Sequence, residues 1–201
     1  MRLSLADVRR AIRADDDSTS SDYDLNPEVR ASWPASTNLR PAAVLVPLID
    51  GPDGRLDVIL TKRASHLKHH PGQIAFPGGK VENGETLIEA AIREAHEEIA
   101  LLPDNVEILG EMPYHQTVTS FRVTPVVAKV RAEFQSIAEP GEVAEVFRVP
   151  LDFLADRRNY LVEGRFWGGQ KRLYYTVPYG PYYIWGATAR MLLGLQQRLI
   201  P

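Results

Sequence analysis

The chain has 201 residues, of which 23 are basic and 26 acidic, and a formal charge of −3 does not favour a long nucleic-acid track. It has no cysteine, which excludes a disulfide framework, a thiol nucleophile and cysteine-bearing zinc sites. No secretory signal opens it and no apolar run approaches the roughly 20 residues that span a bilayer, so we expect one soluble cytoplasmic domain without membrane or nucleic-acid partners.

The N-terminal segment is expected to hold one short helix and then a linker. Ser4 can cap a helix over Ser4–Ala14, because Asp7 follows three residues later as in a capping box. Residues 15–24 are almost entirely Asp, Ser and Thr, and this composition cannot bury enough apolar surface to offset the entropy lost on ordering. We therefore expect the segment before Asp24 to be dispensable for chemistry.

The remaining sequence predicts strands around one long central helix, with a second helix at the end. Apolar runs predict strands at Ala42–Ile49, Leu56–Thr61, Val106–Met112, Arg122–Val130, Val143–Val149 and Arg172–Val177. The first two resemble a hairpin, because Pro-Asp-Gly at 52–54 is turn chemistry. Apolar residues at 87, 88, 91, 92, 95 and 99 define one face of a helix over Thr86–Leu101, and a closing helix fits Ile184–Leu199. This order indicates a layered α/β or α+β domain with a mixed sheet.

The central helix carries three glutamates opposite its apolar face. Glu94 and Glu98 lie one turn apart, and Glu97 lies on an overlapping face. Like charges at this spacing destabilise a helix by roughly a few tenths of a kcal/mol per pair, a cost that a divalent cation would reverse. Hard cations such as magnesium bind one or two carboxylates directly, so Glu94 and Glu98 are the expected metal ligands. The alternative is an ordinary solvated helix face, since Glu is a strong helix former.

A glycine-rich loop leads into this helix. It runs through Phe76-Pro77-Gly78-Gly79 and then Gly84 and Glu85. Two adjacent glycines let the backbone approach a ligand closely, and their carbonyl or amide groups can join a metal and phosphate site. Arg93, beside the acids, can orient them by bidentate pairing. The loop therefore favours metal binding by the three glutamates over an ordinary solvated helix face.

These residues stand at the spacings of the Nudix box. That pattern is a glycine, five residues, a glutamate, seven residues, Arg-Glu, two residues, Glu-Glu, one residue, a glycine and an aliphatic, matched here by Gly79, Glu85, Arg93, Glu94, Glu97, Glu98 and Leu101. Ala100 stands where the box has glycine, at a helix end where alanine costs about 1 kcal/mol if a left-handed conformation is required. The change removes no metal ligand. The chain thus resembles the Nudix hydrolase family.

The resemblance implies a Nudix-type α/β/α sandwich with a mixed sheet, and hydrolysis of a nucleoside diphosphate linked to another group. It implies Mg²⁺ or Mn²⁺ held by Glu94 and Glu98, with Glu97 as an auxiliary ligand. It gives Glu97, Glu98 and Arg93 catalytic roles. Glu142 follows Pro140-Gly141 on a predicted loop and could reach the metals as a further ligand or general base, with Glu145 as its competitor.

A second stretch resembles the signature that precedes the box in coenzyme A pyrophosphatases. That signature is Leu-Leu-Thr-x-Arg-Ser, three residues, Arg, three residues, Gly, three residues, Phe-Pro-Gly-Gly. Here Ile59, Ala64 and Lys68 replace its first leucine, its serine and its second arginine, and Lys68 keeps the charge without the planar fork. Positive charge gathers in this stretch at Lys62, Arg63, His66, Lys68, His69 and His70, and would draw a polyanion.

The second resemblance implies that the substrate is coenzyme A or an acyl derivative, cut to 3′,5′-ADP and (acyl-)4′-phosphopantetheine. The substrate-binding residues it implies are Arg63, Lys68, Gly78 and Gly79. Ordinary surface ion pairs are the alternative for the two cations. Other open alternatives are a Nudix hydrolase of ADP-ribose or another nucleoside diphosphate derivative, an oxidised nucleoside triphosphate as substrate, removal of an RNA cap, and a non-catalytic nucleotide-binding regulator.

The resemblance covers roughly Leu39 to Leu199 and includes segments at 123–127, 142–151 and 184–188. We therefore assign residues 39–201 to a Nudix hydrolase domain and residues 1–38 to an N-terminal helix and Asp/Ser-rich linker. Trp185 could stack on adenine, but an aromatic at the start of an apolar helix favours a core position, as for Tyr182 and Tyr183. A homodimer is implied by resemblance only.

Overall fold

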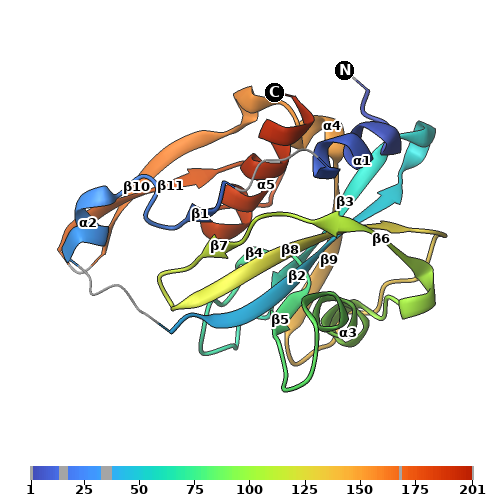
Figure 1. Ribbon diagram of the computed structural model, residues 1–201, viewed down its shortest axis with the longest axis horizontal. Coiled ribbons are helices and arrows are strands. Elements are labelled where there is room, and N and C mark those ends of the chain that lie inside the picture. Colours follow the sequence, from blue (N-terminus) through green and yellow to red (C-terminus); the bar gives the residue numbers. More distant parts are fainter. Residues whose placement is uncertain (1, 14–17, 33–37, 168, 201) are drawn as a thin grey trace.

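A nine-stranded mixed sheet forms the centre of the computed structural model, which describes residues 2–13, 18–32, 38–167 and 169–200 (Figure 1). Its strands are β1 (Ser20–Ser21), β2 (Arg40–Asp50), β3 (Leu56–Arg63), β4 (Ile74–Ala75), β5 (Gly78–Lys80), β6 (Val106–Glu111), β7 (His115–Gln116), β8 (Phe121–Val130) and β9 (Val143–Pro150). A separate antiparallel hairpin holds β10 (Leu161–Trp167) and β11 (Gln170–Thr176). The helices are α1 (Leu5–Arg13), α2 (Pro27–Ser32), α3 (Leu87–Ile99), α4 (Leu151–Leu154) and α5 (Gly186–Leu199). None of these described helices is long and apolar enough to cross a membrane.

Three strands pair along the length of β2. β8 runs parallel to it, β3 pairs antiparallel with its end, and β5 pairs antiparallel with Ala42–Val44 near its start. The predicted hairpin of β2 and β3 is therefore confirmed. β5 contains the glycines of the sequence motif, and the Leu45 N–H donates to the Pro77 carbonyl oxygen at 2.8 Å just before them. The glycine segment is thus hydrogen-bonded into the central sheet.

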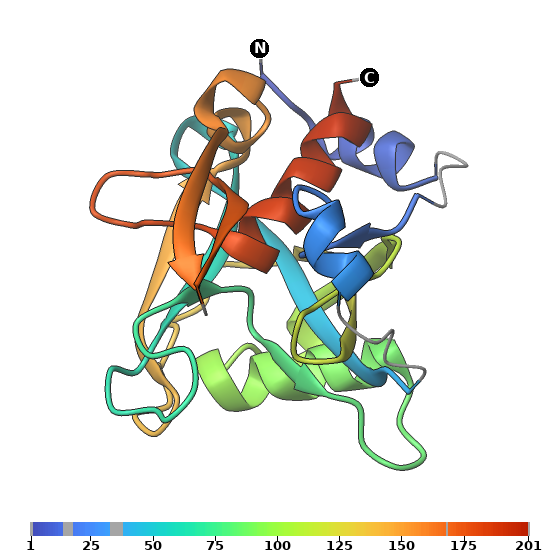
Figure 2. The same ribbon diagram turned by 90° about the vertical axis from the view of Figure 1, so that its left-hand side faces the viewer.

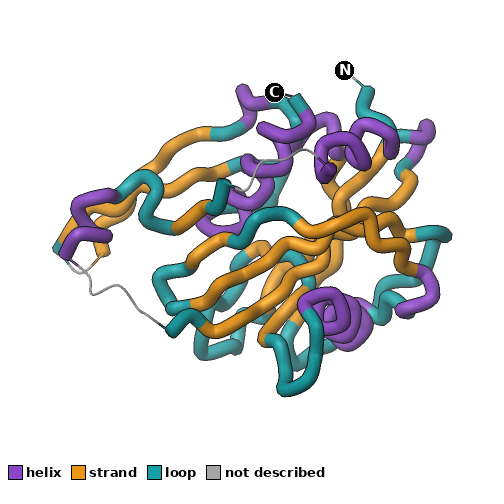
Figure 3. The backbone as a smooth tube through the Cα atoms, viewed as in Figure 1, coloured by secondary structure: helices purple, strands orange, loops and turns teal. Residues whose placement is uncertain are grey.

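Apolar side chains form a core on each face of the sheet. Leu45 and Ile49 of β2 pack in the same cluster as Ala91 of α3, whereas Val46 of β2 packs with Leu192 of α5. Because both faces of β2 are covered, its sequence is apolar without alternation. Figures 1 and 2 show α3 on one side of the sheet and α1 with α5 on the other, and Figure 3 shows the same helices flanking the strands. The predicted α/β/α sandwich with a mixed sheet is confirmed.

Every strand and helix predicted from Ala42 onward is present, with ends within two residues of those expected. The elements that the sequence did not predict are β1, β4, β5, β7, β10, α2 and α4. Most of them are two to four residues long, too short to show a period. β10 lacks alternation and contains Gly164, so its pairing with β11 had no clear sequence signal.

The N-terminal region is partly as predicted. The helix α1 is confirmed, and its capping box is present because the Ser4 N–H donates to Asp7 Oδ2 at 2.9 Å. The expected linker is wrong from Ser20 to Asp24, where β1 pairs in parallel with β7 and Asp22 is hydrogen-bonded to the body. Hydrogen bonds to polar groups of the body stabilise this segment, although it buries little apolar surface. Residues 15–17 of the expected linker, and Ala14 at the end of the expected helix, lie outside the described residues.

The helix α3 has a complete capping box at its start and a strained residue after its end. Thr86 Oγ1 accepts the Glu89 N–H at 3.2 Å, and Glu89 Oε2 accepts the Thr86 N–H at 2.8 Å. After the last turn, Ala100 has φ 57° and ψ 28°, in the left-handed region. Its N–H donates to the His96 carbonyl oxygen at 3.0 Å. A left-handed non-glycine residue costs about 1–2 kcal/mol, so the alanine at the glycine position of the box introduces strain here.

The substitution Ala100→Gly is expected to raise the free energy of unfolding by up to about 1 kcal/mol, because glycine adopts this conformation without strain. Urea denaturation measures the change. The matched control is Ala91→Gly in the middle of the same helix, which is expected to lower stability by about 1 kcal/mol or more. If Ala100→Gly also lowers the free energy of unfolding, the conformation of Ala100 is not strained.

Candidate active site

Two carboxylates of α3 lie against the glycine segment of β5. A Cβ atom at Gly79 would collide with the Glu94 carboxylate, so only glycine allows this approach. Gly78 is more tightly constrained, because a Cβ there would lie 2.5 Å from the Ala43 carbonyl oxygen in the backbone of β2. The Gly78 N–H donates to the carboxylate of Glu98, which is buried. The pairing of β5 with β2 therefore holds both glycines beneath the acids.

Arg93 ties the acids of α3 to the loop in front of them. Its Nε and one terminal nitrogen donate to the two carboxylate oxygens of Glu85 at 2.8 and 3.2 Å. Its other terminal nitrogen donates to Glu94 at 2.9 Å and to Glu97 at 3.1 Å, and the Lys80 carbonyl oxygen accepts a further bond at 3.1 Å. These hydrogen bonds hold the pKa of Glu85 below its usual range. Arg93 thus fixes the orientation of Glu94 without occupying the site itself.

Glu98 lies at the centre of an excess of negative charge. Burial and the nearby carboxylates of Glu94 and Glu142 together raise its pKa to about 8, against the opposing effects of Arg63 and the Gly78 N–H. Burial also raises the pKa of Glu94. Removing carboxylates from water without a full countercharge is costly, so this cluster favours a bound cation.

Glu142 reaches the cluster from the loop before β9. The Ala64 N–H donates to the Glu142 carbonyl oxygen at 2.8 Å, next to the irregular pairing of Arg63 with Val143. The Glu139 N–H donates to the Glu98 carbonyl oxygen at 3.0 Å, which fixes the same loop to the end of α3. Glu142 and Arg63 therefore belong to the acid cluster although they lie far from α3 in the sequence.

The competing acid Glu145 has a different environment. Its carboxylate accepts the Tyr182 hydroxyl at 2.5 Å, while the ring of Tyr182 stacks on Phe147 with centroids 3.6 Å apart. Glu97 lies at the exposed edge of the cluster, since its side chain is 57% exposed and shares one nitrogen of Arg93 with Glu94. Glu142 is thus the better placed of the two acids considered for the general base.

The carboxylate set fits a hard divalent cation that is only partly coordinated by protein. In the residues that the structure describes, no three acidic or histidine side chains stand at the spacing of a complete metal cage. Mg²⁺ is bound by one or two carboxylates, with water and substrate phosphates in the remaining positions. Glu94 and Glu98, with only carboxylate oxygens to offer, match that donor set. The chemistry of the donors therefore suits Mg²⁺ or Mn²⁺ better than a softer ion.

A cavity of about 340 Å³ opens beside Gly78, and we call it the inner cavity. Arg63 lines it at the acid end, and Val44, Phe76 and Trp185 supply much of its apolar wall. A second, outer cavity of about 670 Å³ shares residues His70, Gln73, Ile74, Val118, Thr119 and Trp185 with it. Its basic lining residues are Lys62, Lys68, His69, His70 and Arg165. A path thus runs from the acid cluster through an apolar chamber to a basic one.

The structure separates the two cations predicted to bind substrate. Arg63 lies near Glu98, whereas Lys68 is exposed in the outer cavity. The expectation that Trp185 and Tyr183 are core residues is wrong: Trp185 is half-buried and lines both cavities, and Tyr183 is 42% exposed. Their segment precedes α5 and turns toward the hairpin, so its side chains face the cavities.

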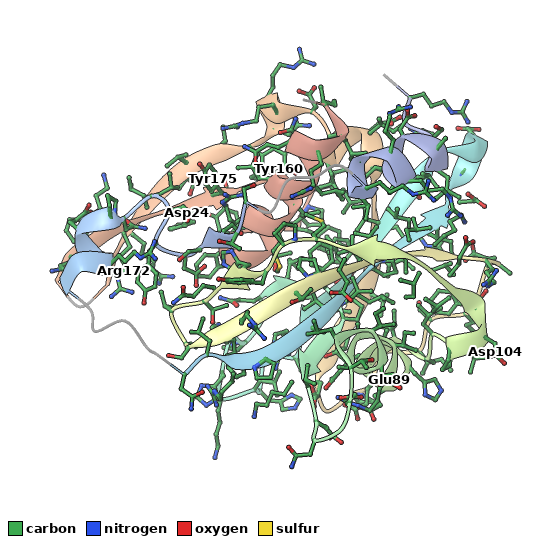
Figure 4. The ribbon with its side chains drawn as sticks, in the orientation of Figure 1. Asp24, Glu89, Asp104, Tyr160, Arg172 and Tyr175 are labelled. Carbon is green, nitrogen blue, oxygen red and sulfur yellow. The ribbon has the colours of Figure 1, made fainter. Side chains whose placement is uncertain are left out.

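Three residues that line the cavities were not predicted from the sequence. Asp22 and Arg172 line the inner cavity, and Arg165 lines the outer one. Figure 4 shows Arg172 on the hairpin at the end of the molecule near α2, well away from Glu89 in the first turn of α3. Nothing in their sequence spacing relates these residues to the acids, because the hairpin and the N-terminal segment reach the cavities only through the tertiary fold.

Comparisons with known proteins agree with this site. A family model described as NUDIX domain matches residues 39–166. The chain is 44% identical over 168 residues to the Nudix hydrolase NudL of Enterobacter sp. (strain 638), covering 82% of this chain and 86% of that protein. It is 41% identical over 170 residues to NudL of Cronobacter sakazakii (strain ATCC BAA-894), covering 84% and 85%. A solved MutT/nudix family protein from Enterococcus faecalis shares the fold, with a TM-score of 0.52 and 16% identity over 100% of this chain and 76% of that one.

The matched residues include the glycine segment, α3 and the loop before β9, and hence every carboxylate of the acid cluster. The family model covers more than half of the chain, and the relatives are well above 30% identical over most of it. The chain therefore belongs to the Nudix hydrolase family, whose members hydrolyse phosphoanhydrides.

Proposed function

We propose that this hydrolase is a metal-dependent pyrophosphatase of coenzyme A or acyl-coenzyme A, releasing 3′,5′-ADP and (acyl-)4′-phosphopantetheine. One observation carries the proposal: the cavity beside the acids continues into a chamber lined by cations. A substrate cut at its pyrophosphate would then have a further phosphate to place in that chamber. Coenzyme A has such a group on its ribose, whereas ADP-ribose does not.

The chemistry is assigned to the acid cluster. Glu94 and Glu98 hold the divalent ion, which Nudix hydrolases generally need, and a bound ion supplies Lewis acidity toward the phosphates. Glu142 accepts the proton of the attacking water, since Glu145 is engaged by Tyr182. Glu97 would serve as an auxiliary ligand. Arg93 positions the ligands, and Gly78 and Gly79 let the phosphates approach the backbone.

Substrate binding divides between the two cavities. Arg63, beside Glu98, faces the phosphates at the cleavage position. Lys68 in the outer cavity reaches the ribose 3′-phosphate. We assign the catalytic unit to residues 39–201. The preceding residues complete the wall of the inner cavity through Asp22 and Asn26.

The enzyme is expected to prefer coenzyme A over dephospho-coenzyme A, and Lys68→Ala is expected to reduce that preference. A lost charge-assisted contact is worth roughly 1.5–3 kcal/mol, or about tenfold to a hundredfold in kcat/KM. The measurement is kcat/KM for both substrates at fixed metal and salt, with products resolved by mass. Lys171→Ala is the matched control, because Lys171 is exposed and lines neither cavity.

The same assay includes ADP-ribose and a nucleotide panel. Equal efficiencies for the two coenzymes in the unmodified enzyme, or a much higher efficiency with ADP-ribose, would exclude coenzyme A as the substrate. The phosphoanhydride chemistry would be unaffected by that result.

A further inference from the structure

The β10–β11 hairpin brings two arginines directly opposite each other. Arg165 of β10 pairs with Arg172 of β11 in the antiparallel register. Residues paired in this way project to the same face, with Cβ atoms about 4.5–5.5 Å apart, and like charges there are destabilising. An anion held between two such side chains would offset their mutual repulsion.

This face of the hairpin looks into the cavities. Arg165 lines the outer cavity and Arg172 lines the inner one, and the two cavities share Trp185 and His70. Lys171 lies next to Arg172 in β11, but successive side chains of a strand point to opposite faces, and Lys171 lines neither cavity. The two arginines thus line the substrate path, and Lys68 lines the outer cavity together with Arg165.

The two acidic side chains near this face of the hairpin accept hydrogen bonds from groups other than Arg165. Glu163, on the same face of β10, accepts the Tyr183 hydroxyl at 2.6 Å. Asp22 lies 3.0 Å from His115 Nε2 and accepts the Val118 N–H at 2.9 Å. Within the part of the chain that the structure describes, Arg165 forms no ion pair with an acidic side chain. The guanidinium of Arg165 therefore presents its charge to the outer cavity.

We propose that Arg165 and Arg172 form a phosphate-binding subsite that reads a phosphate of the substrate remote from the cleaved anhydride. Arginine suits this task, because its planar fork can donate two parallel hydrogen bonds to phosphate oxygens. The inference rests on the proposed function, in which the remote group is the ribose 3′-phosphate. Lys68, which also lines the outer cavity, then contributes a point charge, and the arginines supply the directional contacts.

Calorimetric binding of 3′,5′-ADP and 5′-AMP, which differ only in the 3′-phosphate, tests the subsite without turnover. The unmodified enzyme with magnesium is expected to bind 3′,5′-ADP at least about tenfold more tightly. Arg165→Ala and Arg172→Ala are each expected to lose most of that difference, while affinity for 5′-AMP stays the same. Lys171→Ala, the control on the opposite face, is expected to keep the difference, and Arg165→Lys to keep only part of it.

The subsite is disproved if the unmodified enzyme binds the two nucleotides equally, or if both alanine variants keep the full preference while remaining folded by circular dichroism. Turnover of coenzyme A is measured separately. Turnover without an arginine-dependent preference would contradict this inference alone. An arginine-dependent preference in an enzyme that does not cut coenzyme A would contradict the proposed function and leave the subsite in place.

Discussion

Glu98→Gln is expected to lower kcat by more than about a hundredfold. Loss of a group that merely orients a metal ligand costs 10- to 100-fold, and Glu98 is placed to bind the ion directly. The amide keeps the side-chain volume but removes the anionic donor beside Glu94 and Glu142. Steady-state kinetics over a range of magnesium and manganese concentrations measure the loss, and higher metal is expected to recover only part of it.

Two comparisons keep this test specific. The metal-free variant should unfold at no lower urea concentration than the unmodified protein, since the neutral amide replaces a carboxyl whose ionisation is opposed by burial and by two neighbouring acids. Glu97→Gln, on the exposed side of the same helix, is expected to lose no more than about tenfold. Near-normal turnover by a folded Glu98→Gln enzyme would refute its role as a metal ligand.

Deletion of residues 1–24 is expected to remove most of the folding stability, contrary to the expectation from composition alone. Leu3 and Val8 are buried against the main body, and full burial of such side chains contributes about 1.5–3 kcal/mol each. The deletion also removes Ser20 and Asp22, the two partners of His115, whose exposed fraction is 0%. Total domain stabilities are only about 5–15 kcal/mol, so thermal and urea unfolding should show a large loss.

Asp22→Ala tests the same segment in a chain that is expected to fold. Loss of its carboxylate leaves His115 and the Val118 N–H without an acceptor, at an expected cost of about 1–3 kcal/mol. Because Val118 lines both cavities, the KM is expected to rise more than kcat falls. Asp24→Ala is the control, since its ion pair with Arg190 is partly exposed and worth about 1 kcal/mol at most. Unchanged stability and KM in Asp22→Ala would contradict the role of this segment.

The sequence predicted the central helix and its acids because both depend on local spacing. A period of 3.6 residues places Glu94 and Glu98 on one face, and the structure has them there. The nearness of Arg63 and Glu142 to these acids was not predictable in the same way. It depends on the pairing of β3 with β9 and on an irregularity at Lys62 and Arg63, which are features of register.

Composition gave a wrong prediction for the N-terminal segment, because its polar side chains form hydrogen bonds with the body of the protein. The run of Asp and Ser before α2 resembles a linker, yet Asn26 uses its side-chain amide to donate to the Leu173 carbonyl oxygen at 2.8 Å and to accept the Leu173 N–H at 2.7 Å. Such bonds stabilise an irregular segment without apolar burial, and neither partner is visible from hydropathy. For the same reason the hairpin arginines had no sequence signal.

The pairing of β5 with β2 has a consequence for binding entropy. Gly78 and Gly79 have no side chains and would lose the most conformational freedom if a free loop had to order around a phosphate. Here their backbone is fixed by strand pairing with Ala43 and Val44, so the entropy is lost during folding and not during ligand capture. Amide hydrogen exchange at these two glycines should accordingly be slow before any nucleotide is added, and addition of ligand should change it little.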